Sequence, residues 1–351
     1  LERPQAILIT SLMTYWYAGL AETVDLLREV FAGVPLLLGG IYASLMPEHA
    51  TRSIRVDEVL PGPGELELTE ALFRRTGFRP GLDKSSPPIQ FTPDLDLLRS
   101  VRFLPLLTSR GCPYRCVYCA SRIIQPMYRR RDPKEVIQEI EAAILKYEID
   151  EITLYDDAFL CNSNDHALVI LDAFQSFKPK LKWHTPNGLH VSEINPRVAL
   201  SMKRAGFKTV RLGLESTSDD FHTRSGRKTT WVDFLKAVDH LKKAGFEQRD
   251  IGVYLLVGLP DQTISQIEND VEMALKAGTY PKLAEYSPIP GSALWSKSVQ
   301  ASHYPIDLEP LFQNCSLLPV ATPEVNWEFL SRIRKSIRES IESSRTNESN
   351  V

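Results

Sequence analysis

The sequence predicts an α/β protein in which a short parallel sheet precedes a partial barrel of six strand–helix units. Two observations lead to this prediction. Apolar runs of strand length alternate with amphipathic helical stripes along most of the 351 residues, a pattern that is typical of parallel sheets covered by helices. Six such units follow one another at 104–296, as in a partial (β/α)6 TIM-like barrel, whose chemistry would lie at the carboxyl ends of the strands.

The composition limits the class of protein. With 41 Lys and Arg against 44 Asp and Glu, the formal net charge is −3, so no cationic surface field supports a nucleic-acid partner. The chain is 43% apolar and 24% charged, which argues against intrinsic disorder. No apolar run reaches the roughly 18 residues that a membrane-spanning helix needs, and the first residues do not form a secretory signal. We therefore expect a cytoplasmic protein without a membrane span.

Residues 1–77 are expected to form a Rossmann-like parallel sheet domain. Strands are predicted at 6–10, 35–40 and 57–60, with helices at 20–31 and 65–73. The second strand ends in Gly39 and Gly40, where the backbone must approach a neighbour closely. Because only three strands are predicted and no initiator Met precedes Leu1, we expect this sheet to be truncated at its N-terminal side.

The remainder of the chain divides into three parts. Residues 78–103 are rich in Pro and lack periodicity, which indicates a linker. In the barrel domain at 104–296, strands are predicted at 104–108, 151–155, 182–184, 208–214, 251–257 and 282–286. Helix N-caps are predicted at Asp132, at Asn195, at Thr229 or Thr230, and at Thr263. A C-terminal extension at 297–351 is expected to contain a polar helix at 327–343 and then a disordered tail.

Three of the five cysteines lie close together on one loop. Cys112, Cys116 and Cys119 follow the first barrel strand in the spacing Cys-x-x-x-Cys-x-x-Cys, with Tyr118 before the last of them. A short loop can direct three thiolates at one soft metal centre and leave one position open. The alternative is a structural zinc knuckle that borrows Cys161 or a histidine. Such clustering is typical of a reduced compartment and a metal site rather than of a disulfide framework.

With this motif, residues 104–295 resemble the radical S-adenosylmethionine (SAM) superfamily. The resemblance implies a six-unit partial barrel and a [4Fe–4S] cluster held by Cys112, Cys116 and Cys119, with SAM at the remaining iron. It implies that reduction cleaves SAM to a 5′-deoxyadenosyl radical, which abstracts hydrogen from the substrate. The electron would come from an external one-electron reductant of the flavodoxin or ferredoxin type.

The resemblance also implies SAM contacts at the ends of later strands. Asp156 and Asp157 match the position that binds the SAM amino group, and Glu215 matches the one that binds the ribose hydroxyls. Arg227 matches the arginine that pairs with the SAM carboxylate, a task that suits a planar guanidinium. Arg224 could take its place. For these charged residues the alternative is an ordinary solvated surface.

Two further residues complete the implied SAM site. Tyr118 matches the aromatic residue that the family places beside the adenine, and Gly258 lies in a segment that packs on the adenine through its backbone. His190 follows the third barrel strand and could either face the substrate or be structural.

Residues 1–77 resemble the cobalamin-binding domain that many radical SAM proteins carry upstream. The contacts implied for the cofactor's nucleotide tail are Ser11, Leu12, Thr14, Gly39 and Gly40. No Asp-x-His-x-x-Gly motif is present, so no histidine is expected below the cobalt, and His49 is interpreted as structural. Pro63 interrupts the acidic turn that is usual in this domain. The alternative is a cofactor-free domain kept as a scaffold or lid.

Together these features predict a radical SAM enzyme of the cobalamin-domain subgroup that transfers methyl groups to an unactivated carbon. A radical rearrangement or oxidation without cobalamin, or a non-catalytic metal-binding scaffold, are the alternatives. Sulfur insertion into tRNA is disfavoured because no cysteine precedes Cys112 to hold a second cluster and no cationic field is present. The substrate can be a small molecule, a lipid or a peptide. Cys161 and Cys315 have no predicted role.

Overall fold

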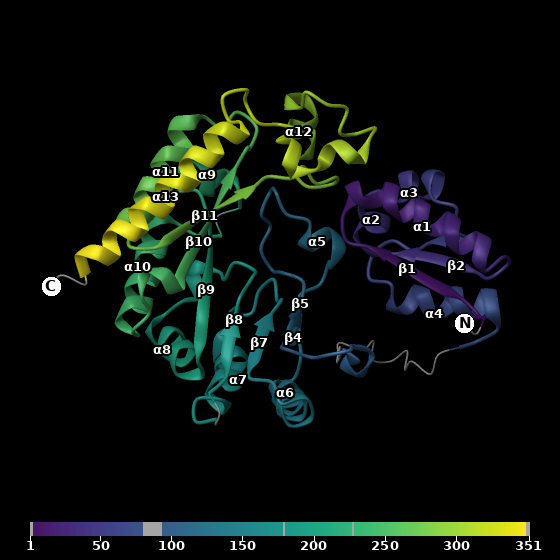
Figure 1. The fold of residues 1–351 in the computed structure, drawn as a ribbon, viewed down its shortest axis with the longest axis horizontal. Coiled ribbons are helices and arrows are strands. Elements are labelled where there is room, and N and C mark those ends of the chain that lie inside the picture. Colours follow the sequence, from purple (N-terminus) through teal and green to yellow (C-terminus); the bar gives the residue numbers. More distant parts are fainter. Residues whose placement is uncertain (1–2, 80–92, 178–179, 227, 349–351) are drawn as a thin grey trace. The chain divides into compact units, whose positions relative to one another are not determined.

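The computed structural model describes residues 3–79, 93–177, 180–226 and 228–348 (Figure 1). Contacts between Cα atoms group the chain into two compact units. Unit 1 comprises Leu1–Pro88, Tyr118–Pro126 and Ser287–Val320, and unit 2 comprises Ile89–Val117, Met127–Tyr286 and Ala321–Val351. The domains predicted from the sequence run consecutively along the chain, whereas two later segments group with the N-terminal residues. The predicted linker at 78–103 lies partly outside the described residues.

Unit 1 is built on a small parallel sheet. Its strands are β1 (Ile7–Ser11), β2 (Leu36–Gly39) and β3 (Glu58–Val59), in that order across the sheet. The helices that follow them are α1 (Tyr17–Val30), α2 (Gly40–Leu45), α3 (Pro47–Ser53) and α4 (Glu65–Thr76). The later segments add the short helices α5 (Ser121–Ile124) and α12 (Trp295–Ala301) and the 3-10 turns at Pro310–Gln313 and Cys315–Leu317. The predicted three-stranded Rossmann-like sheet is thereby confirmed.

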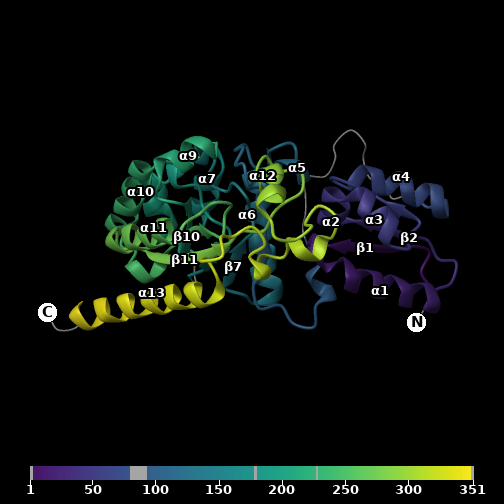
Figure 2. The same ribbon diagram turned by 90° about the horizontal axis from the view of Figure 1, so that it is seen from above.

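Neighbouring leucines of β2 fill the two faces of this sheet. Leu38 packs in one apolar cluster with Leu20 and Val24 of α1, and Leu37 packs in another with Ala71 of α4. Figures 1 and 2 show α1 and α4 on opposite sides of the strands. Because side chains alternate along a strand, one short apolar run is buried on both faces. Each of these leucines, almost fully buried, contributes about 1.5–3 kcal/mol.

Unit 2 contains the predicted partial barrel. Its six parallel strands pair in the order β11-β10-β9-β8-β7-β4, so each strand lies beside its predecessor among them. They are β4 (Leu104–Leu106), β7 (Glu151–Leu154), β8 (Lys182–His184), β9 (Phe207–Glu215), β10 (Ile251–Val257) and β11 (Tyr280–Glu285). A short antiparallel pair, β5 (Ser109–Arg110) with β6 (Arg129–Arg130), was not predicted.

Helices cover the outer side of this curved sheet (Figure 1). They are α6 (Pro133–Tyr147), α7 (Ala167–Ala173), α8 (Pro196–Ala205), α9 (Asp219–Arg224), α10 (Trp231–Lys243) and α11 (Ile264–Lys276). The predicted N-caps are confirmed by hydrogen bonds that the cap side chains accept from the first turn. The caps are Asp132 for α6, Asn195 for α8, Thr230 rather than Thr229 for α10, and Thr263 for α11.

The C-terminal helix α13 (Trp327–Glu348) is longer than predicted. Arg334 on this helix forms an ion pair with Glu285 of β11, and Figure 2 shows the helix running along the same side of unit 2 as β11. The sequence analysis ended this helix at residue 343 and expected a disordered tail from 344 onwards. That boundary is wrong, because no Gly or Pro interrupts 344–348. Of the helices within the described ranges, none is long and apolar enough to cross a membrane.

The core of unit 2 contains a histidine that predicts a pH-dependent stability. His166 is 1% exposed, and neither ring nitrogen has a hydrogen-bond partner among the described residues. Burial and then the positive charge of Arg130 lower the pKa of His166 to about 4. The unfolded chain, with a His pKa of about 6.5, therefore binds this proton more readily, so stability is lost as the pH falls from about 6.5 to 4.

We expect the free energy of unfolding to fall by about 3 kcal/mol across this window through His166 alone. The measurement is urea denaturation of the full chain at several pH values, with His166→Leu as the comparison. The variant should lose less stability than the wild type between pH 6.5 and pH 4. Equal losses in the two proteins would contradict this role for His166.

Candidate active site

The cysteine loop leaves the carboxyl end of β4, the end at which the other strand-end motifs also lie. Its base is closed by the β5–β6 pair, in which Ser109 lies opposite Arg130. Cys112 and Cys116 belong to unit 2 and Cys119 to unit 1. All three are half-buried, and none is in a disulfide. Within the described ranges, no group of three or more His, Cys, Asp or Glu side chains is already arranged to hold a metal ion.

Cys112 lies against His190, which follows β8. The Cys112 Sγ to His190 Nε2 distance is 3.8 Å, and the rings of Tyr114 and His190 are 4.3 Å apart. Tyr114 donates a hydrogen bond to Glu193 at 3.0 Å. Burial and the charge of Lys228 lower the pKa of His190 to about 3, so its ring is neutral. These contacts favour the structural interpretation of His190, as a residue packed against the cysteine loop.

In unit 1, Cys119 lies just before α5. Its sulfur accepts a hydrogen bond from the backbone N–H of Ser121 at 3.4 Å and lies 3.2 Å from the Ser121 hydroxyl. Hydrogen bonds of this kind stabilise a thiolate relative to a thiol. Tyr118, the predicted adenine contact, is half-buried beside it in the sequence.

Asp156 is buried beneath the strand end that leads into the cysteine loop. Its carboxylate accepts hydrogen bonds from Thr108 N (3.0 and 3.1 Å), Thr108 Oγ1 (2.7 Å) and Ser109 Oγ (2.6 Å). Burial raises the pKa of Asp156, and these hydrogen bonds oppose that effect. Asp157, the next residue, is exposed. The two predicted carboxylates therefore differ: Asp156 braces the loop, and Asp157 presents its charge at the surface of the strand end.

Glu215 ends β9 in a left-handed conformation, with φ at +71°. Its Oε1 lies 3.0 Å from the Nζ of Lys228 in an ion pair whose side chains are only 12% and 11% exposed. The sequence analysis did not single out Lys228. The position predicted to bind the SAM carboxylate, Arg227, lies outside the described residues, and Arg224 is an exposed residue paired with Asp220. A second cation in the Arg227-Lys228 pair was the signal that could have identified it.

Two side chains that sequence reasoning missed shape the neighbouring strand ends. Buried Asp270 on α11 accepts hydrogen bonds from Thr217 N at 2.7 Å and Thr217 Oγ1 at 2.6 Å, and so fixes the turn after β9. Gln262 bonds to Leu256 O and Leu259 N. These bonds close the turn that contains Gly258, whose φ is +78°. The predicted segment around Gly258 is therefore a tight, backbone-exposing turn.

The predicted cobalamin contacts in unit 1 are placed differently from one another. Leu12 is 56% exposed, whereas Ser11 and Thr14 are buried. Ser11 Oγ donates to Met13 O at 2.9 Å, and Thr14 Oγ1 donates to Gln313 Oε1 at 2.5 Å. The hydroxyls of Ser11 and Thr14 thus already have partners within the protein. His49 bonds to the hydroxyl of Tyr42 and stacks edge-on to Tyr17, in agreement with its structural interpretation.

Gly39 and Gly40 lie at the end of β2, where the backbone passes close to β1. Gly39 has no near neighbour for a side chain except Leu60 O, 3.8 Å from an added Cβ. Gly40 has φ at +89°, and an added Cβ would lie 2.2 Å from Thr10 Oγ1 and 3.0 Å from Ser11 O. Gly40 therefore has a structural reason of its own, because only glycine fits between the two strand ends.

This crowding predicts a large stability loss for Gly40→Ala. The matched control is Gly62→Ala, where φ is +77° but nothing lies within 4 Å of the added Cβ. We expect the control to cost about 1 kcal/mol through its backbone conformation. Gly40→Ala should cost about 3 kcal/mol because a steric clash adds to the same strain. Urea denaturation of both variants tests this difference, and equal losses would contradict it.

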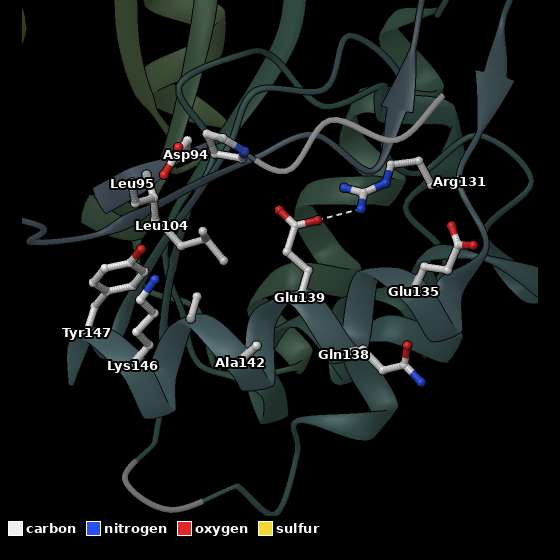
Figure 3. A pocket seen from close by; sticks show the side chains of 12 residues that line it. Asp94, Leu95, Leu104, Arg131, Glu135, Gln138, Glu139, Ala142, Lys146 and Tyr147 are labelled. Atoms are coloured by element: carbon white, nitrogen blue, oxygen red, sulfur yellow. Dashed lines mark hydrogen bonds and ion pairs between the residues drawn. The ribbon is translucent and has the colours of Figure 1, made fainter. Parts of the chain in front are cut away.

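A pocket of about 710 Å³ lies elsewhere in unit 2, along α6 (Figure 3). Arg131 and Glu139 form a buried ion pair in its wall. Lys146 and Tyr147 lie at its other end, near Asp94. None of the residues predicted to hold the cluster or SAM lines this pocket. It is therefore distinct from the candidate active site.

The barrel and its cysteine loop define the class of protein. Residues 106–274 match the family model of the Radical SAM superfamily, and the chain belongs to this superfamily, as the sequence analysis predicted. The family requires an iron–sulfur cluster and SAM. The donor set fits a cluster, because three thiols lie on one loop, two of them beside a buried lysine that offsets thiolate charge.

Among curated proteins, the chain is 27% identical over 81% of its length to an uncharacterised methyltransferase of Pyrococcus horikoshii. It is 23% identical over 79% of its length to the anaerobic magnesium-protoporphyrin IX monomethyl ester cyclase of Rubrivivax gelatinosus. The chain spans 66% of the first relative and 55% of the second.

Two solved structures share the fold. The radical SAM methyltransferase TsrM of Kitasatospora setae, solved with tryptophan and a SAM analogue, matches with a TM-score of 0.69 at 17% identity, over 85% of this chain and 66% of that one. The cobalamin-dependent SAM radical enzyme OxsB, solved with aqua-cobalamin and SAM, matches with a TM-score of 0.60 at 18% identity, over 77% and 43% of the two chains. The α/β architecture with a partial barrel is thus confirmed.

Proposed function

We propose that this chain is a radical SAM enzyme whose [4Fe–4S] cluster is held by Cys112, Cys116 and Cys119. The observation that carries the proposal is the three-cysteine loop at the carboxyl end of β4, within residues that match the family model. When bound, the reduced cluster supplies the electron that cleaves SAM to a 5′-deoxyadenosyl radical. An external one-electron donor of the flavodoxin or ferredoxin type would reduce it.

The side chains at the strand ends then have distinct tasks in binding SAM. Asp157 is exposed and suited to pair with the SAM amino group, while Asp156 holds the loop in place. Glu215 would accept hydrogen bonds from the ribose hydroxyls, and Arg227 would pair with the carboxylate. Tyr118 and the turn at Gly258 would enclose the adenine.

The first test of this proposal is the cofactor content of the chain. After anaerobic reconstitution with iron and sulfide, we expect about four irons per chain and the broad visible absorbance of a cubane cluster. The electron paramagnetic resonance (EPR) spectrum of the reduced cluster should change when SAM is added, because SAM would bind the iron that lacks a thiolate. A protein that binds only zinc would support the structural zinc knuckle instead.

We further propose that the reaction is cobalamin-dependent methyl transfer to an unactivated carbon. Both solved structures with this fold are of SAM enzymes, one named a methyltransferase and the other cobalamin-dependent. Unit 1 would hold the nucleotide tail between the ends of β1 and β2, where Leu12 is exposed and Gly39 is uncrowded. Ser11, Thr14 and Gly40 would shape this slot from behind.

Cobalamin binding can be tested without a substrate. The full chain should retain hydroxocobalamin, seen as a corrin absorbance, through gel filtration. Leu12→Asp should weaken retention, because it places a charge on the exposed face of the slot. The matched control is Leu26→Asp, which alters an equally exposed leucine on α1. No retention by the wild-type chain would leave unit 1 as a cofactor-free domain.

A cyclisation or oxidation is the second candidate, and one relative is named a cyclase. The two candidates differ in what becomes of SAM. Methyl transfer converts SAM to S-adenosylhomocysteine, whereas reductive cleavage alone yields 5′-deoxyadenosine and methionine. With substrate present and SAM labelled in its methyl group, methyl transfer predicts label in the product, and a cyclisation predicts none. The substrate can be a small molecule, a lipid or a peptide.

A further inference from the structure

The Lys228–Glu215 pair is unusually buried for an ion pair in this protein. Its side chains are 11% and 12% exposed, against 39% and 43% for Lys182–Glu151 at the amino ends of β8 and β7. The pair is seated over Gly213, where an added Cβ would lie 2.8 Å from Lys228 Nζ and 3.0 Å from Glu215 Oε1. A charged pair this buried interacts more strongly with its surroundings than a surface pair does.

The segment that carries Lys228 also touches the cysteine loop. Gly226 has φ at +100°, and an added Cβ there would lie 2.8 Å from Arg115 O and 3.7 Å from Cys116 N. Burial alone would lower the pKa of Lys228, but attraction to Glu215 and to the thiols of Cys116 and Cys112 raises it above its usual value. Lys228 is therefore an ammonium ion whose nearest charges are one carboxylate and two predicted cluster ligands.

Reduction of a cluster in this loop would place one more negative charge beside that ammonium. The cluster gains one electron from the external donor, the donor loses one, and no bond forms or breaks. A fixed positive charge in a poorly solvated site stabilises the reduced form, and a fixed negative charge destabilises it. Lys228 and Glu215 therefore act on the reduction with opposite signs.

We propose that Lys228 raises the reduction potential of the cluster held by Cys112, Cys116 and Cys119, and that Glu215 limits this rise. The inference rests on the proposed function, since it needs the cluster. It assigns Lys228 a positioning and electrostatic role. When SAM is absent, Lys228 also holds the Glu215 carboxylate at the end of β9.

The experiment is a potentiometric titration of the reconstituted full chain, without SAM, followed by the EPR signal of the reduced cluster. In Lys228→Met, we expect the equilibrium constant for reduction to fall about tenfold, which corresponds to a potential about 59 mV more negative for a one-electron couple. Glu215→Gln should shift the potential upwards, and the double variant should return close to the wild type. The control, Lys182→Met, should leave the potential unchanged.

The pattern of signs decides the outcome. Equal potentials in Lys228→Met, Glu215→Gln and the wild type, or shifts of the same sign in both variants, would overturn the inference. If Lys228→Met does not fold, the upward shift in Glu215→Gln still tests it. If the wild-type chain forms no cluster, the missing visible absorbance shows that the proposed function itself has failed, and the inference fails with it.

Discussion

Replacing Cys116 by alanine is expected to abolish the iron–sulfur cluster. Two thiols remain on the loop, and a cubane with two protein ligands is lost readily. We expect the visible absorbance of the reconstituted protein to fall by at least about tenfold, and the iron content with it. Far-ultraviolet circular dichroism should be unchanged, because Cys116 is half-buried on a loop and forms no disulfide.

The matched control for this substitution is Cys315→Ala. Cys315 is also half-buried and outside any disulfide, but it follows the turn that contains Gln313 in unit 1. It should keep its full iron content. Equal iron in Cys116→Ala and Cys315→Ala would contradict the cluster assignment, because any thiol would then serve as well as the predicted one.

The second large effect is expected at Asp156. Asp156→Ala removes the acceptor of Thr108 N, Thr108 Oγ1 and Ser109 Oγ, and leaves these donors buried without partners. Each unsatisfied buried donor costs about 1–3 kcal/mol, so we expect the free energy of unfolding to fall by about 3–5 kcal/mol. Because the same contacts brace the base of the cysteine loop, the surviving folded protein should also take up less iron.

Asp157→Ala provides the comparison for this effect. Asp157 is exposed, so its removal should change the free energy of unfolding by no more than about 0.5 kcal/mol. If Asp157 binds the SAM amino group, this variant should instead weaken SAM binding with its cluster intact. Urea denaturation and SAM titration separate the two. A variant at Asp156 as stable as the one at Asp157 would contradict the bracing role.

The regular parts of unit 2 could be predicted because local patterns specify them. The strands at 182–184 and 251–257 have the predicted bounds, since an apolar run between helices allows one register. Asn195 and Thr263 cap their helices as predicted, because a cap depends only on the next few residues. The short β5–β6 pair could not be foreseen, since it joins residues on either side of the cysteine loop.

What the sequence could not provide are contacts between distant residues. Gln313 bonds to Thr14 and to Met46, nearly the whole chain away, and such contacts group Ser287–Val320 with unit 1. The pairing of Lys228 with Glu215 depends on a turn after β9 that no periodicity predicts. Likewise, nothing in the Tyr155-Asp156-Asp157 string shows that one carboxylate is buried and the next exposed. A motif identifies the residues, and the fold decides their roles.

The central claim is that the three-cysteine loop supports reductive cleavage of SAM. Its most direct test is to mix the anaerobically reconstituted full chain with SAM and dithionite and to quantify 5′-deoxyadenosine by mass spectrometry. We predict 5′-deoxyadenosine and methionine from the wild-type chain and none from Cys116→Ala. A wild-type chain that carries its full complement of iron and sulfide yet forms no 5′-deoxyadenosine would contradict the claim.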